Sequence, residues 1–126
     1  MAHLPGTSIH LLADLGEGKG LSNVALVEAT LWEAAEAAGA HVLSVHVHPF
    51  GAGMGVTGVA LLAESHISIH TWPETGVAAV DLFVCGKDAD AAAGLAVIAR
   101  NLRAVVLREK VVERLLDQAV DRQATR

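Results

Sequence analysis

Three closely spaced strand patterns constrain the fold of this chain more than any other feature. Residues 56–63, 67–72 and 77–85 each show the two-residue alternation or the β-branched content of a strand, and only a few residues separate them. Connections this short join antiparallel neighbours, because a parallel connection needs a crossover of a dozen or more residues. The middle of the sequence therefore predicts an antiparallel meander.

The segments before the meander predict strand, helix and strand. Residues 8–15 are rich in Ile and Leu and end at the glycine-broken stretch 16–20. An apolar face with helical spacing follows over residues 24–38, with Ser22 or Asn23 as its N-cap. Residues 41–48 then alternate as a half-buried strand does.

After the meander we expect a helix over residues 88–102 and a strand over residues 104–112. Asp88 or Asp90 lies near the start of that helix, where a carboxylate suits the helix dipole. From Glu113 onward the pattern is charged and predicts a helix that frays into a tail.

This order of elements predicts an α+β fold, a two-layer sandwich with the helices on one face of an antiparallel sheet. We expect one domain over residues 1–126. The other sheet face, expected to be apolar and built from small residues, needs a cover. A second copy of the chain is the most economical cover, so we expect a homodimer with the active site near its interface.

Composition narrows the class of partner. The net charge is −5 and no basic stripe is present, which argues against nucleic acid and anionic membranes. No apolar run approaches the roughly 20 residues that a membrane helix needs, and the start lacks the pattern of a signal peptide. We therefore expect a cytoplasmic protein with a small-molecule ligand.

The Glu64–Ser65 peptide bond, at the head of a histidine-bearing strand, is the predicted site of self-cleavage. A serine hydroxyl that attacks the preceding carbonyl turns the amide into an ester, and β-elimination then leaves a pyruvoyl group on residue 65. The products are residues 1–64 (β chain) and residues 65–126 (α chain). His70 has the chemistry of the base. Alternation places it on the face opposite to Ser65, so Ser65 must lie on a bend if the two are to meet.

Several segments together resemble the short prokaryotic S-adenosylmethionine decarboxylase proenzymes. The similar residues are Leu62-Ala63-Glu64-Ser65-His66, Ile69-His70-Thr71-Trp72-Pro73-Glu74, and Ala78-Ala79-Val80-Asp81-Leu82-Phe83 with Cys85-Gly86. The resemblance implies a pyruvoyl-dependent decarboxylase that needs no external cofactor. Its implied product is decarboxylated S-adenosylmethionine, the aminopropyl donor for spermidine synthesis.

The resemblance also implies roles for individual residues. His70 promotes the elimination, the Thr57 hydroxyl helps to hold the ester, and Cys85 returns a proton to the substrate carbon after CO₂ leaves. On that role alone, Cys85→Ala would lower turnover and leave cleavage at Ser65 in place. Three further residues are implied to bind substrate: Phe50 stacks on adenine and faces the sulfonium, Glu74 accepts hydrogen bonds from the ribose, and Asp14 lies near the site.

Some positions depart from the family pattern. Aromatic residues are usual just after the acidic residue of the first strand and after Trp-Pro-Glu, where this chain has Leu15-Gly16 and Thr75-Gly76-Val77. Fewer aromatic faces weaken adenine stacking and sulfonium binding. Arginine or ornithine therefore remains an alternative substrate, and an uncleaved, non-catalytic homologue is the alternative from another class.

Two further motifs lead to no predicted site. His46 and His48 share a strand face and could bind a metal together with His66 or His70, but no Cys or carboxylate stands at a recognised metal-ligand spacing. We therefore predict no metal site. The segment 16–20 resembles a phosphate loop in composition only, because the final Gly-Lys-Ser/Thr is missing.

Overall fold

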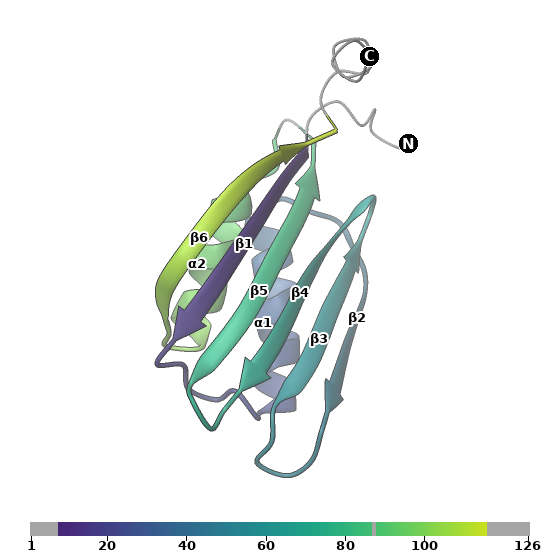
Figure 1. Ribbon diagram of the computed structural model, residues 1–126. Coiled ribbons are helices and arrows are strands. Elements are labelled where there is room, and N and C mark those ends of the chain that lie inside the picture. Colours follow the sequence, from purple (N-terminus) through teal and green to yellow (C-terminus); the bar gives the residue numbers. More distant parts are fainter. Residues whose placement is uncertain (1–7, 87, 116–126) are drawn as a thin grey trace, which may run out of the picture.

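The computed structural model describes residues 8–86 and 88–115 as one six-stranded antiparallel sheet with two helices packed on one face (Figure 1). The elements in chain order are β1 (Ser8–Gly16), α1 (Val24–Ala37), β2 (Val42–Pro49), β3 (Val56–Leu62), β4 (Ser65–Trp72), β5 (Val77–Cys85), α2 (Ala91–Asn101) and β6 (Val105–Arg114). The strand order is β2-β3-β4-β5-β1-β6. The predicted α+β architecture and its central meander are confirmed.

The ends of two strands differ from the sequence-based expectation. β4 begins at Ser65 rather than at residue 67, because Ser65 pairs directly with Leu62 across a two-residue turn. β6 continues through Glu113 and Arg114, which pair with Ile9 and Ser8. The helix expected from Glu113 onward is therefore wrong at these two residues, and its continuation over residues 116–126 lies outside the described part.

Both helices begin at a capping side chain. The Asn23 side chain accepts a hydrogen bond from the Leu26 amide at 3.0 Å, and Asp90 does the same for Ala93 at 3.0 Å. Each cap satisfies one amide that has no partner within the helix. Asn23 and Asp90, rather than Ser22 and Asp88, are thus the caps.

The core lies between the sheet and the helix pair. Its fully buried side chains are aliphatic, and they come from one face of the strands and from the inner sides of α1 and α2. Representative members are Leu11, Leu31, Ile67, Leu82 and Ile98. Within residues 8–86 and 88–115, neither helix is long and apolar enough to span a membrane.

The sheet face away from the helices, here called the open face, has a mixed character. Strand alternation puts Leu12 and Leu61 on it, but also His10, His70 and Asp81. The expectation of a uniformly small and apolar face is therefore wrong. The histidines and Asp81 stand at the positions that alternate with the buried aliphatic residues, so the same pattern that builds the core exposes them here.

Candidate active site

The Glu64–Ser65 peptide bond lies in the tight turn that joins β3 to β4. Leu62 and Ser65 close the turn as a register pair, and only Ala63 and Glu64 lie between them. Glu64 has a φ of 68°, in the left-handed region. That conformation costs a residue with a side chain about 1 kcal/mol, so the bond predicted to break is held next to a strained residue.

Two side chains donate hydrogen bonds to the carbonyl groups of this turn. The Cys85 thiol, at the end of β5, donates to the carbonyl oxygen of Glu64 with 3.3 Å between sulfur and oxygen. The Ser65 hydroxyl donates to the Ala63 carbonyl at 3.4 Å. A thiol at the Glu64 oxygen stands where negative charge develops when a nucleophile attacks that carbonyl. The sequence did not predict this contact, because Cys85 ends β5 whereas Glu64 lies in the β3–β4 turn, 21 positions earlier.

His70 and Thr57 lie at the opposite end of β4 and β3. They form a register pair, and the Thr57 Oγ1 and His70 Nδ1 atoms are 3.1 Å apart. His70 follows Ser65 by five residues of extended strand, which at about 3.3 Å per residue separates them by about 17 Å. A bend that joins them is absent, because β4 is regular from Ser65 to Trp72. Within one chain, Cys85 therefore contacts the Glu64 carbonyl, while Ser65 lies about 17 Å from His70.

The predicted substrate-binding residues gather around His70. Phe50, Thr57, His70 and Glu74 line a pocket of about 240 Å³ at this end of the sheet. Asp14 and His70 line a second pocket of about 200 Å³. All five predicted residues thus flank one end of the sheet, while Glu64, Ser65 and Cys85 lie at the other end.

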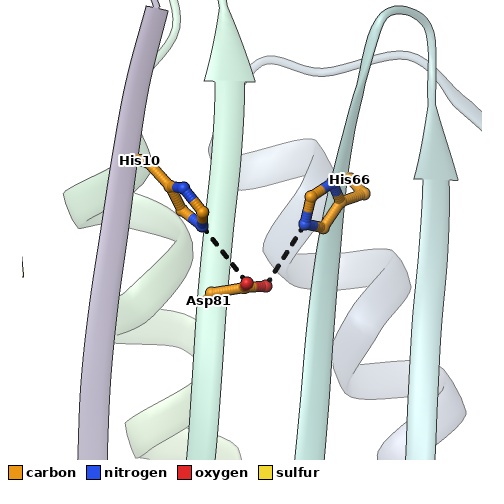
Figure 2. A group of neighbouring side chains, drawn as sticks. All are labelled: His10, His66 and Asp81. Carbon is orange, nitrogen blue, oxygen red and sulfur yellow. Dashed lines mark hydrogen bonds and ion pairs between the residues drawn. The ribbon is translucent and has the colours of Figure 1, made fainter. Parts of the chain in front are cut away.

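A carboxylate between two imidazoles lies on the open face between these two ends (Figure 2). Asp81 Oδ2 is 3.2 Å from His10 Nε2, and Asp81 Oδ1 is 3.4 Å from His66 Nε2. The Ser68 hydroxyl donates to Asp81 Oδ1 at 2.6 Å. Burial acts to raise the pKa of Asp81, but the Ser68 and His10 hydrogen bonds and the two nearby imidazoles outweigh it and lower that pKa.

Three ligand atoms from His10, His66 and Asp81 lie within 4.8 Å of one another, which is close enough to consider a metal. The surroundings of His10 argue against one. Arg114 NH1 is 3.1 Å from His10 Nδ1, and a guanidinium can only donate, so the ring proton belongs on Nε2. A metal-ligating histidine normally shows the reverse arrangement, with its second nitrogen donating to a carbonyl or carboxylate.

The sequence analysis missed Ser8, Ser68 and Asp81 as members of this face. Strand parity was the available signal, because residues 8 and 10, 66 and 68, and 81 and 85 share one face of the sheet once the strands are paired. Parity alone does not give the register between strands, so the contacts themselves were out of reach.

Comparison with known proteins identifies the relatives of this chain. The family profile described as S-adenosylmethionine decarboxylase matches residues 9–120. A protein from Caldanaerobacter subterraneus subsp. tengcongensis, named S-adenosylmethionine decarboxylase proenzyme, is 41% identical over 83% of this chain and 86% of its own length. One of the same name from Parasynechococcus marenigrum is 51% identical over 67% of this chain.

The chain covers 65% of the length of that second relative, which is less than two thirds. Among solved structures, the crystal structure of the adenosylmethionine decarboxylase from Aquifex aeolicus is similar. It has a TM-score of 0.73 and 34% identity, over 88% of this chain and 91% of that one.

Proposed function

The chain belongs to the S-adenosylmethionine decarboxylase family, and we propose that it cleaves itself and decarboxylates S-adenosylmethionine through a pyruvoyl group made from Ser65. The observation that carries this proposal is the thiol of Cys85 on the carbonyl oxygen of the Glu64–Ser65 bond, at 3.3 Å. A carbonyl that is about to be attacked benefits from it directly.

Cleavage begins when the Ser65 oxygen bonds to the carbonyl carbon of Glu64. The C–N bond breaks, and the hydroxyl proton passes to the released amine, which leaves an ester. A base then removes the α-proton of residue 65, and the Glu64 carboxylate departs. Residue 65 is then a dehydroalanine, whose imine form is hydrolysed by water. Ammonia leaves, and the fragment of residues 65–126 keeps a pyruvoyl group at its new end. The left-handed Glu64 and the Cys85 hydrogen bond both favour the first of these steps.

The pyruvoyl ketone supplies an electron sink for the loss of CO₂ from a substrate that carries an amine. Cys85 lies against the bond from which that ketone is made. We therefore assign to Cys85 the proton that replaces the carboxylate on the substrate carbon. The same thiol would then serve cleavage as a hydrogen-bond donor and turnover as an acid.

The pocket around His70 suits the rest of the substrate. Phe50 is 56% exposed there, and an aromatic face attracts a sulfonium by roughly 0.5–1 kcal/mol at an exposed site. The Glu74 carboxylate can accept hydrogen bonds from ribose hydroxyls, and Asp14 lines the neighbouring pocket. The side-chain cations of arginine and ornithine also suit Phe50 and Glu74, so only the ribose and the adenine distinguish S-adenosylmethionine from them in this pocket.

The two ends of the open face come together only between two copies of the chain. A two-fold axis that lies along the open face and crosses the strands reverses their direction, so Ser65 of one copy faces His70 of the partner subunit. Each site then contains Ser65 and Cys85 from one copy and the residues of the His70 end from the other. We therefore propose a homodimer of cleaved protomers with two shared sites.

Intact mass measured under denaturing conditions tests the cleavage. We expect fragments of residues 1–64 and 65–126, the second with a pyruvoyl end, and an intact chain for Ser65→Ala. Release of CO₂ from S-adenosylmethionine, arginine and ornithine in parallel then identifies the substrate. A chain that stays full-length after long incubation would favour the non-catalytic homologue.

Mixed dimers test the sharing of sites. Ser65→Ala lacks the nucleophile and His70→Ala lacks the base, so neither variant alone forms a pyruvoyl end. Refolded together, they pair an intact Ser65 with an intact His70 on the partner. We expect a pyruvoyl end on the His70→Ala chain in the mixture only. Its absence there would mean that each chain uses its own His70.

A further inference from the structure

Ser8 is a buried hydroxyl next to the cleavage turn. It begins β1, pairs in register with Cys85 of β5, and is 2% exposed. Its hydroxyl donates to the Cys85 sulfur at 3.3 Å, and that sulfur in turn donates to the Glu64 carbonyl oxygen at 3.3 Å. A directed chain therefore runs from the Ser8 hydroxyl through the thiol to the bond that breaks.

The direction of this chain matters because a thiol has a single proton. When the Ser8 hydroxyl donates to sulfur, the thiol proton is directed to the Glu64 oxygen. Donation into an acceptor also strengthens the bond that the acceptor itself donates, since hydrogen bonds in series polarise one another. The hydroxyl also anchors the Cys85 side chain on the side opposite Glu64.

The same hydroxyl faces sulfur after the thiol has lost its proton. A hydrogen bond to a charged acceptor is roughly twice as strong as one between neutral groups. Ser8 therefore stabilises the thiolate that remains when Cys85 has protonated a product. Arg108, Lys110 and Arg114 alternate along the neighbouring strand β6, and the Arg114 guanidinium contacts the His10 ring at 3.1 Å and lies 5.5 Å from the centre of the Phe83 ring.

We propose that Ser8 is a positioning residue that holds the Cys85 thiol proton on the Glu64 carbonyl and stabilises the sulfur once that proton has left. The proposal rests on the proposed function for its consequences, which are faster cleavage and faster turnover. The hydrogen-bond chain itself is present in the uncleaved chain and does not depend on any activity.

The first test is spectroscopic and uses the uncleaved Ser65→Ala chain. Cys85 is the only cysteine, so one S–H stretching band in the infrared reports this thiol alone. Replacing Ser8 by Val should move the band to higher frequency and broaden it, because the thiol becomes a weaker and less oriented donor. The Thr side chain has nearly the same shape as that of Val but keeps the hydroxyl, so Ser8→Thr should leave the band in place.

The second test measures chemistry in the chain with an intact Ser65. We expect Ser8→Val and Ser8→Ala to slow cleavage about threefold and, after cleavage, to lower kcat about tenfold with KM unchanged. This loss is smaller than the 10²–10³ typical of deleting an oxyanion donor, because the thiol remains. Ser8→Thr should restore both rates, and Ser22→Ala, at an exposed serine before α1, should change neither.

The outcomes separate the two proposals. A band that is identical in Ser8→Val and Ser8→Thr overturns the role of Ser8, whatever the rates are. A second outcome is that the band shifts in the Ser8→Val variant while the protein with an intact Ser65 never cleaves. That result supports the hydrogen bonds from Ser8 to Cys85 and Glu64 and overturns the proposed function. If the band shifts but Ser8→Val and Ser8→Thr cleave and turn over at equal rates, the hydrogen bond from Ser8 does not assist the chemistry.

Discussion

At the scale of single residues, Cys85 joins the two halves of the proposed chemistry. Its thiol contacts the carbonyl of Glu64, the residue whose φ of 68° strains the turn. The sequence suggested only that Cys85 acts after cleavage, as a proton donor. The contact supports a second proposed role before cleavage, because the carbonyl oxygen that accepts the thiol hydrogen bond would gain negative charge under attack by Ser65.

Cys85→Ala should therefore slow both processes, which revises the expectation drawn from the sequence alone. We expect cleavage to slow about tenfold, since a thiol is a weaker donor than the amides that supply 10²–10³ in other oxyanion sites. Turnover of the cleaved enzyme should fall by about 10²–10⁴, as for a lost general acid. Mass spectra over time and CO₂ release measure the two rates. Wild-type values in both would remove Cys85 from the mechanism.

The charge of Asp81 makes the stability of the fold depend on pH. Its pKa is lowered in the folded chain from an ordinary value of 3.8. The carboxylate therefore stabilises the fold above that value, and this stabilisation is lost as the pH falls through the lower, folded pKa. Asp81→Asn should cost about 1 kcal/mol at pH 7, because Asp81 is half-buried and hydrogen-bonded.

Urea unfolding of Asp81→Asn in the Ser65→Ala background measures this cost without interference from cleavage. The difference in the free energy of unfolding between Asp81→Asn and its parent should stay constant from pH 7 to about pH 5. It should narrow below about pH 4, where the parent carboxylate becomes protonated and loses its charge. A difference that persists unchanged in acid would show that the asparagine disturbs packing rather than charge. Glu28→Gln, on the exposed side of α1, is a suitable control.

At the scale of elements, the β2–β3 loop approaches the end of β4 closely at the proposed substrate pocket. Gly55 lines that pocket together with Phe50 and His70. A Cβ atom at Gly55 would lie 2.0 Å from the carbonyl oxygen of Thr71, which belongs to the backbone of β4. Thr71 itself is fixed, because its buried hydroxyl donates to the Leu21 carbonyl at 2.7 Å. Neither partner can move away cheaply.

Gly55→Ala should thus lower the free energy of unfolding by about 3 kcal/mol, at the upper end for overpacking. It should also raise KM, because the loop that carries Phe50 must move. Gly53→Ala is the matched control in the same loop. Its Cβ has nothing within 4 Å, and only its φ of 73° is unfavourable, so about 1 kcal/mol is expected. Thermal unfolding of both variants compares the two costs, and equal costs would contradict the steric argument.

At the scale of the whole molecule, the sheet has helices on one face only (Figure 1), and its open face mixes exposed apolar residues with titratable ones. Leu12 and Leu61 are 41% and 45% exposed on that face. Exposed apolar side chains near both the Cys85 end and the His70 end of the face suit an interface between two copies of the chain better than a surface in contact with solvent. The shared-site proposal requires contact across this same face.

A charge at Leu61 should separate the proposed dimer without unfolding the chain, because that side chain is already 45% exposed in the protomer. We expect Leu61→Lys to sediment as a monomer at micromolar concentration and to form no pyruvoyl end. Trp32→Lys, an equally exposed position on α1, should leave both unchanged, since it lies on the helix layer. A monomeric parent chain, or a dimeric Leu61→Lys that forms pyruvoyl normally, would contradict the proposed interface.

The sequence by itself determined the elements, the layer order and the bond to examine. Alternation with period two acts over a few residues, so it can be read locally, whereas only the structure decided between Ser22 and Asn23 and between Asp88 and Asp90 at the helix starts. The Glu64–Ser65 motif and the family resemblance are also local strings. The antiparallel meander followed because its connections are too short for any other pairing.

Only the tertiary structure decided which of these residues meet. Ser8 and Cys85 lie 77 positions apart and touch because β1 inserts between β5 and β6, a pairing that local propensity does not specify. His70 is near Ser65 in the sequence yet about 17 Å away, because an extended strand keeps its residues apart. Register between distant strands depends on the packing of the whole sheet on its helices, so it appears only when the chain is folded.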